Sequence, residues 1–184
     1  MDAAVTAGAE TARPLFARLL GEDFAALPDV VRRLHLRAGP ARYLGEVDVR
    51  RGHGLLSRLC AAATRLPPAG NGAIAVDIDI QPNAERWIRH VRGHAMASRL
   101  WREDGLLCEQ LGLVRFGFRL RVRDGGIEWT VERVRALGVP LPARWFSGVR
   151  ARESAQGERY AFDVQAALPV IGPLVHYRGW LDVA

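Results

Sequence analysis

The acidic residue best placed to do chemistry is Glu109, because its neighbours along the chain are apolar. It directly follows the apolar run 106–108. A carboxylate buried in such surroundings either pairs with an arginine or has a raised pKa, and the second state suits general acid–base catalysis. Arginine is plentiful here, so a structural ion pair is the simpler expectation. An acid–base site would use Glu109 with Arg89 or Arg178.

A second candidate group is Glu85, Trp87 and Arg89, which follow one another at every second position. On a strand this spacing places all three side chains on one face. They would then form a pocket wall in which an aromatic ring is flanked by an acid and a base. The alternative is an ordinary surface ladder of cross-strand partners.

Two further motifs contain residues that often bind anions or metals. The segment 51–54, Arg-Gly-His-Gly, precedes an expected helix, so Arg51 and His53 could lie beside backbone N–H groups that bind an anion. The same residues also suit a plain turn. His90 and His94 fall on an expected strand, where four residues span about 13 Å, so we expect no shared metal ion.

Catalytic signatures are missing from the sequence. It contains no GxSxG elbow, no HExxH pair, no phosphate loop and no GxGxxG segment after a strand. We therefore assign no catalytic residue and no cofactor, and we favour a protein that is not an enzyme.

The elements that must position these residues are mainly strands. Apolar residues alternate with polar ones along 74–81, 116–122 and 160–166, which is typical of antiparallel strands with one buried face. Weaker alternation predicts further strands at 44–50, 85–92, 96–102, 127–136, 145–153 and 174–183.

Short helices are predicted near the N-terminus. Pro14 and Gly21 bracket one apolar segment, 28–39 contains a second, and 55–66 carries a third amphipathic pattern. The length of 184 residues fits one domain. We expect a frayed segment 1–12, a helical portion 13–66 that includes the first strand, and an antiparallel sheet over 72–184.

Glycines inside the strand patterns predict bending. Gly93, Gly117, Gly148 and Gly179 each interrupt an apparent strand, and a glycine there often marks a bulge or a close backbone approach. Alternatively, some of them simply end strands. We expect an α+β fold that is mainly β: a strongly curved sheet or half-open barrel of about eight or nine strands with two or three short helices.

A curved sheet encloses a hollow, and the five tryptophans are residues that can line one. The leading hypothesis is therefore a binding module for a small, largely apolar ligand, and ordinary core packing of the tryptophans is the alternative. The candidate ligand-binding residues are Trp87, Arg89, Glu109, Trp101, Arg178, Trp180, Arg51 and His53.

The charge of +6 comes entirely from arginine, since the chain contains no lysine. This favours a compositional bias over a phosphate-binding surface, so we expect no nucleic-acid partner. A third interpretation is an Arg-rich docking face over 115–123. With no long apolar run, no signal-like N-terminus and two cysteines expected to be reduced, we predict a cytoplasmic protein without stable membrane insertion.

Several local motifs occur in a fixed order along the chain: Leu27-Pro28 with Val31-Arg32-Arg33-Leu34-His35, 51–56, 85–89, Gly105-Leu106-Leu107 with Glu109, 137–142 and 177–181. Together they resemble those of the bacterial domain of unknown function 4166 family. The resemblance implies no activity and no catalytic residues. It implies that members occur alone or attached to a nicotinamide-type reductase or a small membrane protein, so an accessory role beside an oxidoreductase remains an alternative.

Overall fold

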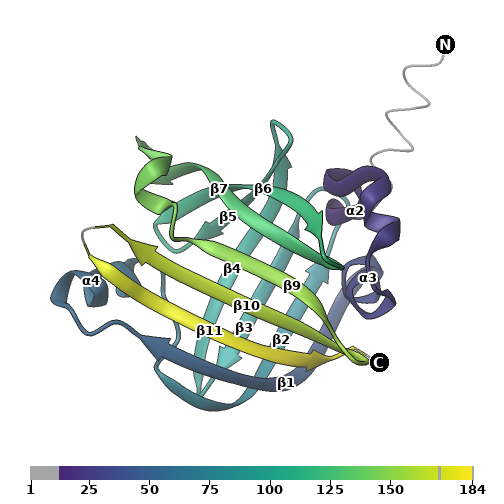
Figure 1. Cartoon of the computed structure of the whole chain (residues 1–184), viewed down its shortest axis with the longest axis horizontal. Coiled ribbons are helices and arrows are strands. Elements are labelled where there is room, and N and C mark those ends of the chain that lie inside the picture. Colours follow the sequence, from purple (N-terminus) through teal and green to yellow (C-terminus); the bar gives the residue numbers. More distant parts are fainter. Residues whose placement is uncertain (1–12, 170, 184) are drawn as a thin grey trace.

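A computed structural model describes residues 13–169 and 171–183 of the chain. The segment 1–12, for which we expected fraying, lies outside the described residues. Within them, the chain forms a β-barrel with helices at both ends (Figure 1).

The first helices form where proline and glycine bracket apolar segments. Helix α2 (Leu15–Leu20) follows Pro14 and ends at Gly21, which adopts the positive φ of 60° that glycine tolerates. A 3₁₀ turn, η1 (Gly21–Ala26), leads to α3 (Asp29–Leu36). Helix α3 carries an acid in its first turn and bases in its last turn, which suits the helix dipole. All three predicted helices are confirmed, the third being α4 (Leu55–Ala63).

The described residues contain eleven strands, which form one antiparallel sheet. They are β1 (Gly39–Arg51), β2 (Gly70–Ile80), β3 (Glu85–Val91), β4 (His94–Glu103), β5 (Leu106–Leu111), β6 (Val114–Arg123), β7 (Gly126–Ala136), β8 (Val139–Leu141), β9 (Arg150–Gln156), β10 (Arg159–Leu168) and β11 (Gly172–Asp182).

The sheet closes into a barrel through β7. This strand pairs with β6 along one edge, while its first half pairs with β9 along the other edge. The remaining part of that second edge is taken by the short β8. All strands except β8 therefore form a closed ring, β6-β5-β4-β3-β2-β1-β11-β10-β9-β7.

The prediction of a half-open barrel with about eight or nine strands was therefore wrong in two details, closure and strand number. It missed β5 because residues 106–109 are buried on both faces and show no alternation. It missed β8 because that strand has only three residues. The predicted strand 145–153 is divided, since a 3₁₀ turn, η2 (Ala143–Phe146), precedes β9.

Two of the four glycines, Gly117 and Gly179, lie inside strands. The pairing of β6 with β7 shifts by one residue after Gly117, where Glu132 of β7 is the extra residue of a β-bulge. At Gly179 in β11 an added Cβ would lie 2.0 Å from the Glu46 carbonyl oxygen and 2.7 Å from the Phe162 ring, so only glycine allows this close approach. Gly93 and Gly148 lie in turns instead.

The helices divide the barrel into two different ends (Figure 1). At the closed end, α2, η1 and α3 pack against the barrel, with contacts from α3 to β9 and β10 and from α2 to β4 and β6. The open end carries α4, η2, β8 and the turns at 112–113 and 137–138. Among the described residues, no helix is both long enough and apolar enough to cross a bilayer.

Candidate functional site

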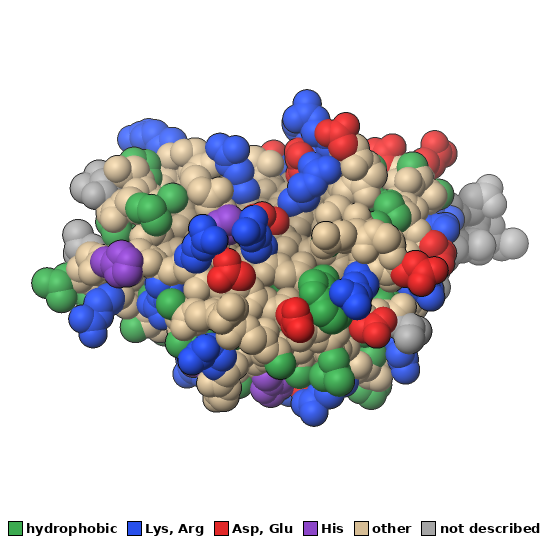
Figure 2. Space-filling model, turned by 60° about the horizontal axis from the view of Figure 1, so that its bottom comes forward, with side chains coloured by type: hydrophobic (Ala, Val, Ile, Leu, Met, Phe, Trp, Pro, Cys, Tyr) green, Lys and Arg blue, Asp and Glu red, His purple; other side chains and the backbone are tan. Residues whose placement is uncertain are grey.

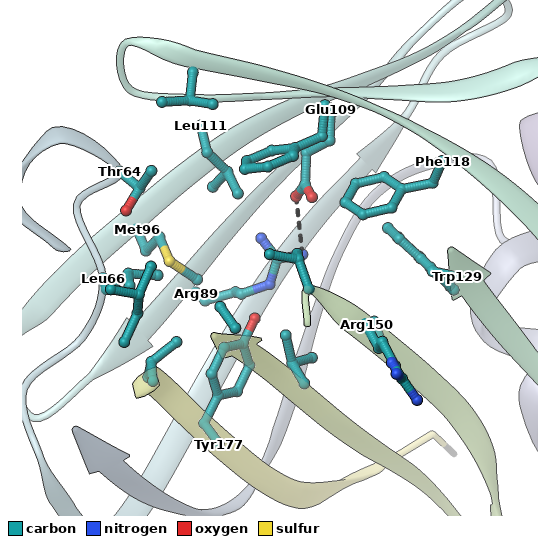
Figure 3. Close-up of a pocket in the computed structure, with 18 of the residues that line it drawn as sticks. Thr64, Leu66, Arg89, Met96, Glu109, Leu111, Phe118, Trp129, Arg150 and Tyr177 are labelled. Carbon is teal, nitrogen blue, oxygen red and sulfur yellow. Dashed lines mark hydrogen bonds and ion pairs between the residues drawn. The ribbon is translucent and has the colours of Figure 1, made fainter. Parts of the chain in front are cut away.

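A cavity of about 430 Å³ lies inside the barrel. Its wall is mostly apolar and its deepest part is bounded by aromatic side chains such as Trp87, Trp129 and Tyr160. It extends to the open end, where Cys60, Leu141, Leu168 and Trp145 also line it; since Trp145 is 48% exposed, the cavity reaches the surface there. Figure 3 shows this space and the side chains that point into it.

An ion pair on the cavity wall joins β3 to β5 across the intervening strand β4. The guanidinium of Arg89 on β3 donates to Oε1 of Glu109 on β5 at 3.4 Å and to Oγ of Ser98, which lies on β4 between them, at 3.0 Å. Both charged side chains are largely buried. Burial lowers the pKa of Arg89, but the Glu109 carboxylate, together with Tyr177 and Tyr160, more than compensates, so the pKa is raised overall. The predicted ion pair is therefore present.

Two tyrosines contribute further polar groups to the cavity, beside the ion pair. Tyr177 on β11 directs its hydroxyl toward Arg89 (Figure 3), and Tyr160 lies on the neighbouring strand β10. Burial is the main cause of a raised pKa at each of them. Both hydroxyls are therefore neutral near pH 7 and can donate or accept hydrogen bonds.

The closed end of the barrel is filled by a network of aromatic and charged groups. His35 of α3 contacts the Glu153 carboxylate of β9 at 2.7 Å, and its ring stacks on Phe16 of α2 at 3.7 Å between centroids. Trp87 donates its ring N–H to Glu85 at 2.9 Å. Burial raises the pKa of Glu85, whose second oxygen has no hydrogen-bond partner in the described part of the chain.

Three of the eight candidate ligand-binding residues meet at the cavity: Trp87, Arg89 and Glu109. The Trp87 ring lies 5.2 Å from the Arg89 guanidinium carbon, within the range of a cation–π contact. The face that Glu85, Trp87 and Arg89 share points inward, so it forms part of the barrel interior rather than a surface ladder.

The other tryptophan candidates lie on the outer face of the barrel. The Trp101 ring has the guanidinium of Arg115 at 4.8 Å, and the Trp180 ring has that of Arg159 at 3.9 Å. Arg178 is exposed on the same outer face of β11 as Trp180. It therefore does not meet Glu109, which removes one of the two partners in the acid–base alternative.

The remaining two candidates flank α4. Arg51 donates to the Pro67 carbonyl oxygen at 3.3 Å, a contact that ties the end of β1 to the segment after α4. His53 is exposed in the loop that enters the helix. Among the described residues, no group of three or more His, Cys, Asp or Glu side chains could hold a metal ion. His90 and His94 have separate partners, Asp77 and the Arg65 carbonyl oxygen.

Sequence reasoning missed Tyr177, Tyr160, His35 and Glu153. His35 carried a usable signal, because Val31, Leu34 and His35 share one helical face and two of them are apolar. The two tyrosines lie at alternating apolar positions of their strands, but nothing local shows that a hydroxyl faces a hollow. Glu153 lay in the predicted strand 145–153 and had no distinguishing pattern.

The Arg-rich face over 115–123 is partly neutralised. Arg119 makes a two-point contact with Glu132, at 3.0 and 2.9 Å, and Arg115 pairs with Glu103. Arg121 and Arg123 on the same strand are exposed. The local excess of positive charge is therefore smaller than the sequence implies.

A family model described as "Domain of unknown function (DUF4166)" matches residues 27–181. The matched region includes α3, all eleven strands except the last residue of β11, and every residue of the Arg89–Glu109 site. A comparison with curated proteins finds no match. Since the family model covers nearly the whole barrel, this chain belongs to the domain of unknown function 4166 family.

Proposed function

We propose that this domain binds a small, largely apolar ligand in its barrel. The observation that carries the proposal is the interior cavity of about 430 Å³ with a mostly apolar wall. Protein interiors are normally close-packed, and ligand sites typically measure roughly 300–1,000 Å³ with a few polar groups at fixed positions. An apolar molecule that enters this space leaves water, which favours binding by about 25 cal/mol per Å² buried.

The polar groups of the cavity suggest the kind of ligand. Arg89 and Glu109 neutralise each other, so the pair offers no net charge that would bind a ligand carboxylate or an ammonium group. A neutral hydrogen-bonding group, such as an alcohol or a ketone, fits beside the pair and the Tyr177 hydroxyl without adding charge. We therefore propose a mainly hydrocarbon ligand with one uncharged polar group.

The first test is native mass spectrometry of freshly purified protein, which should show a co-purifying small molecule. The second uses Nile red, a neutral apolar dye. Filling the cavity by Val164→Trp, an inward position of β10, should weaken dye binding about tenfold, which is ~1.4 kcal/mol. Gln165→Trp, the next residue and exposed, is the matched control and should bind like the parent. Equal dye binding by all three proteins would contradict the proposal.

The ligand class is tested by displacing the dye with tetradecanol, tetradecanoate and tetradecylamine. We expect the alcohol to displace it best. The double variant Arg89→Met/Glu109→Leu removes both charges together, a change that often preserves stability. It should still bind the dye but lose the preference for the alcohol. Tightest binding of the carboxylate would show that Arg89 serves an anionic ligand instead.

A further inference from the structure

The exposed apolar side chains of this barrel gather at one end. Eight large hydrophobic residues are exposed in the described part of the chain, and six of these are at the open end. We call these six the apolar rim: Leu55, Leu59, Leu113, Leu137, Val139 and Trp145.

The segments that carry the apolar rim are joined to one another. The backbone N–H of Leu113 donates to the Ala63 carbonyl oxygen at the end of α4, at 3.1 Å. The N–H of Leu137 donates in turn to the Leu113 carbonyl oxygen at 3.0 Å. The helix, the β5–β6 turn and the β7–β8 turn therefore form one continuous surface. Trp145 adds to this surface and also lines the cavity.

The open end is also basic. The connections between strands at this end, 52–69, 92–93, 112–113, 137–149 and 169–171, contain arginine and histidine but no aspartate or glutamate. Arg58, Arg65 and Arg144 are exposed there, and none of the ion pairs in the described residues involves them. Figure 2 shows arginine, histidine and hydrophobic side chains at the left end, while acidic side chains lie toward the middle and right.

We propose that the open end docks on the surface of an anionic lipid bilayer. Leu55 and Leu59 are one helical turn apart and lie on one face of α4, as in helices that rest in a membrane interface. Tryptophan is favoured at that depth, and arginine can keep its charged group among lipid phosphates while its stem lies against apolar surface. Basic residues attract the negative surface of such a bilayer.

This docking arrangement also explains why the rim lies at the end of the barrel where the cavity reaches the surface. With the open end on the bilayer, the cavity would face the membrane, and an apolar ligand could pass between the two without crossing water. The exchange of ligand rests on the proposed function. The docking itself rests only on the rim and its charge.

Vesicle sedimentation tests the docking, with phosphatidylcholine vesicles that either contain or lack phosphatidylglycerol. The parent should bind the anionic vesicles, bind the neutral ones weakly, and be released by added salt. Leu55→Ser/Leu59→Ser and Arg58→Gln/Arg65→Gln should each reduce binding to anionic vesicles about tenfold or more.

The matched controls make the same types of substitution at exposed positions outside the rim. Leu36→Ser/Leu44→Ser changes the two exposed leucines outside the rim, and Arg121→Gln/Arg123→Gln removes two exposed charges near the closed end. Both controls should bind anionic vesicles like the parent. Equal losses in the control and rim variants would overturn the proposal, because net charge or overall exposed apolar surface, rather than the rim, would then explain binding.

Two other results would also overturn the docking proposal. One is a parent protein that does not bind anionic vesicles. The other is a dimer joined through the rim, which the rim variants would abolish. Val164→Trp separates docking from ligand binding. It fills the cavity but leaves the rim intact, so it should bind vesicles normally even though it binds Nile red poorly.

Discussion

Both ends of this barrel carry short helices, but the helices at the two ends differ in how much of their apolar surface they bury. At the closed end, helices α2 and α3 bury most of their apolar residues against the barrel, and Phe16, Leu34 and His35 are 0% exposed. At the open end, α4 leaves Leu55 and Leu59 exposed at 78% and 66%, and a cavity lies beneath it.

The two ends also differ in the acidic residues of their turns and connections. The short turns at the closed end contain Asp104, Asp124 and Glu158, whereas the connections at the open end contain no acid. Folding stability does not require exposed leucines or an unfilled interior. The difference supports the two proposals made above, in which the open end binds and the closed end holds the fold together.

The largest effect expected from this comparison concerns two phenylalanines. Phe16→Ala at the closed end should lower the free energy of unfolding by about 3–5 kcal/mol, because the ring is fully buried against His35 and Trp129. Phe146→Ala at the open end, where the ring is half-buried beside the cavity, should cost only about 1 kcal/mol. Urea unfolding measures both, and equal losses would contradict the division into a structural and a binding end.

A smaller effect concerns the buried acid at the closed end. Burial raises the pKa of Glu85 in the folded state, so ionisation of this carboxyl costs folding energy. There is no cost below its ordinary pKa, and stability falls as pH rises from that value through the folded pKa.

Glu85→Gln removes this ionisation and keeps an oxygen that can accept from Trp87. We expect the variant to be more stable than the parent by about 1 kcal/mol at pH 8, with the difference shrinking toward pH 4. Urea unfolding at several pH values would test this. A difference that grows toward acid pH would mean that Glu85 stabilises the fold as a carboxylate.

The smallest expected effect is at the rim. Leu59→Ser should change the free energy of unfolding by no more than about 0.5 kcal/mol, since the side chain is 66% exposed. Thermal and urea unfolding measure this change. A loss of several kcal/mol would show that α4 needs this leucine for packing, and the rim would then have a structural role.

The amino-acid sequence predicted the element types well where local patterns are strong. Period-two alternation identified β2, β6 and β10, and proline with glycine marked α2 and α3. The prediction failed where local pattern is absent, as in β5, which is buried on both faces, and in β8, which is too short to show a period.

The candidate site was only partly predictable, for a related reason. The shared face of Glu85, Trp87 and Arg89 follows from strand geometry, and the partnership of Glu109 with an arginine follows from the cost of burying a charge. Which arginine it meets depends on strand order. Arg89 and Glu109 are brought together because β3, β4 and β5 are neighbours, whereas Arg178 faces outward.

By itself, then, the sequence determined a curved antiparallel sheet with short helices and a buried acid that needs a partner. These features follow from the periodicity of apolar residues, the backbone freedom of glycine and the cost of desolvating a carboxylate, all of which act within a few neighbouring residues. Only the tertiary structure decided that the sheet closes, that Tyr177 and the Arg89–Glu109 pair share one cavity, and that the exposed leucines collect at the acid-free end. Each of these depends on contacts between segments far apart in the chain, and no local pattern records which segments will meet.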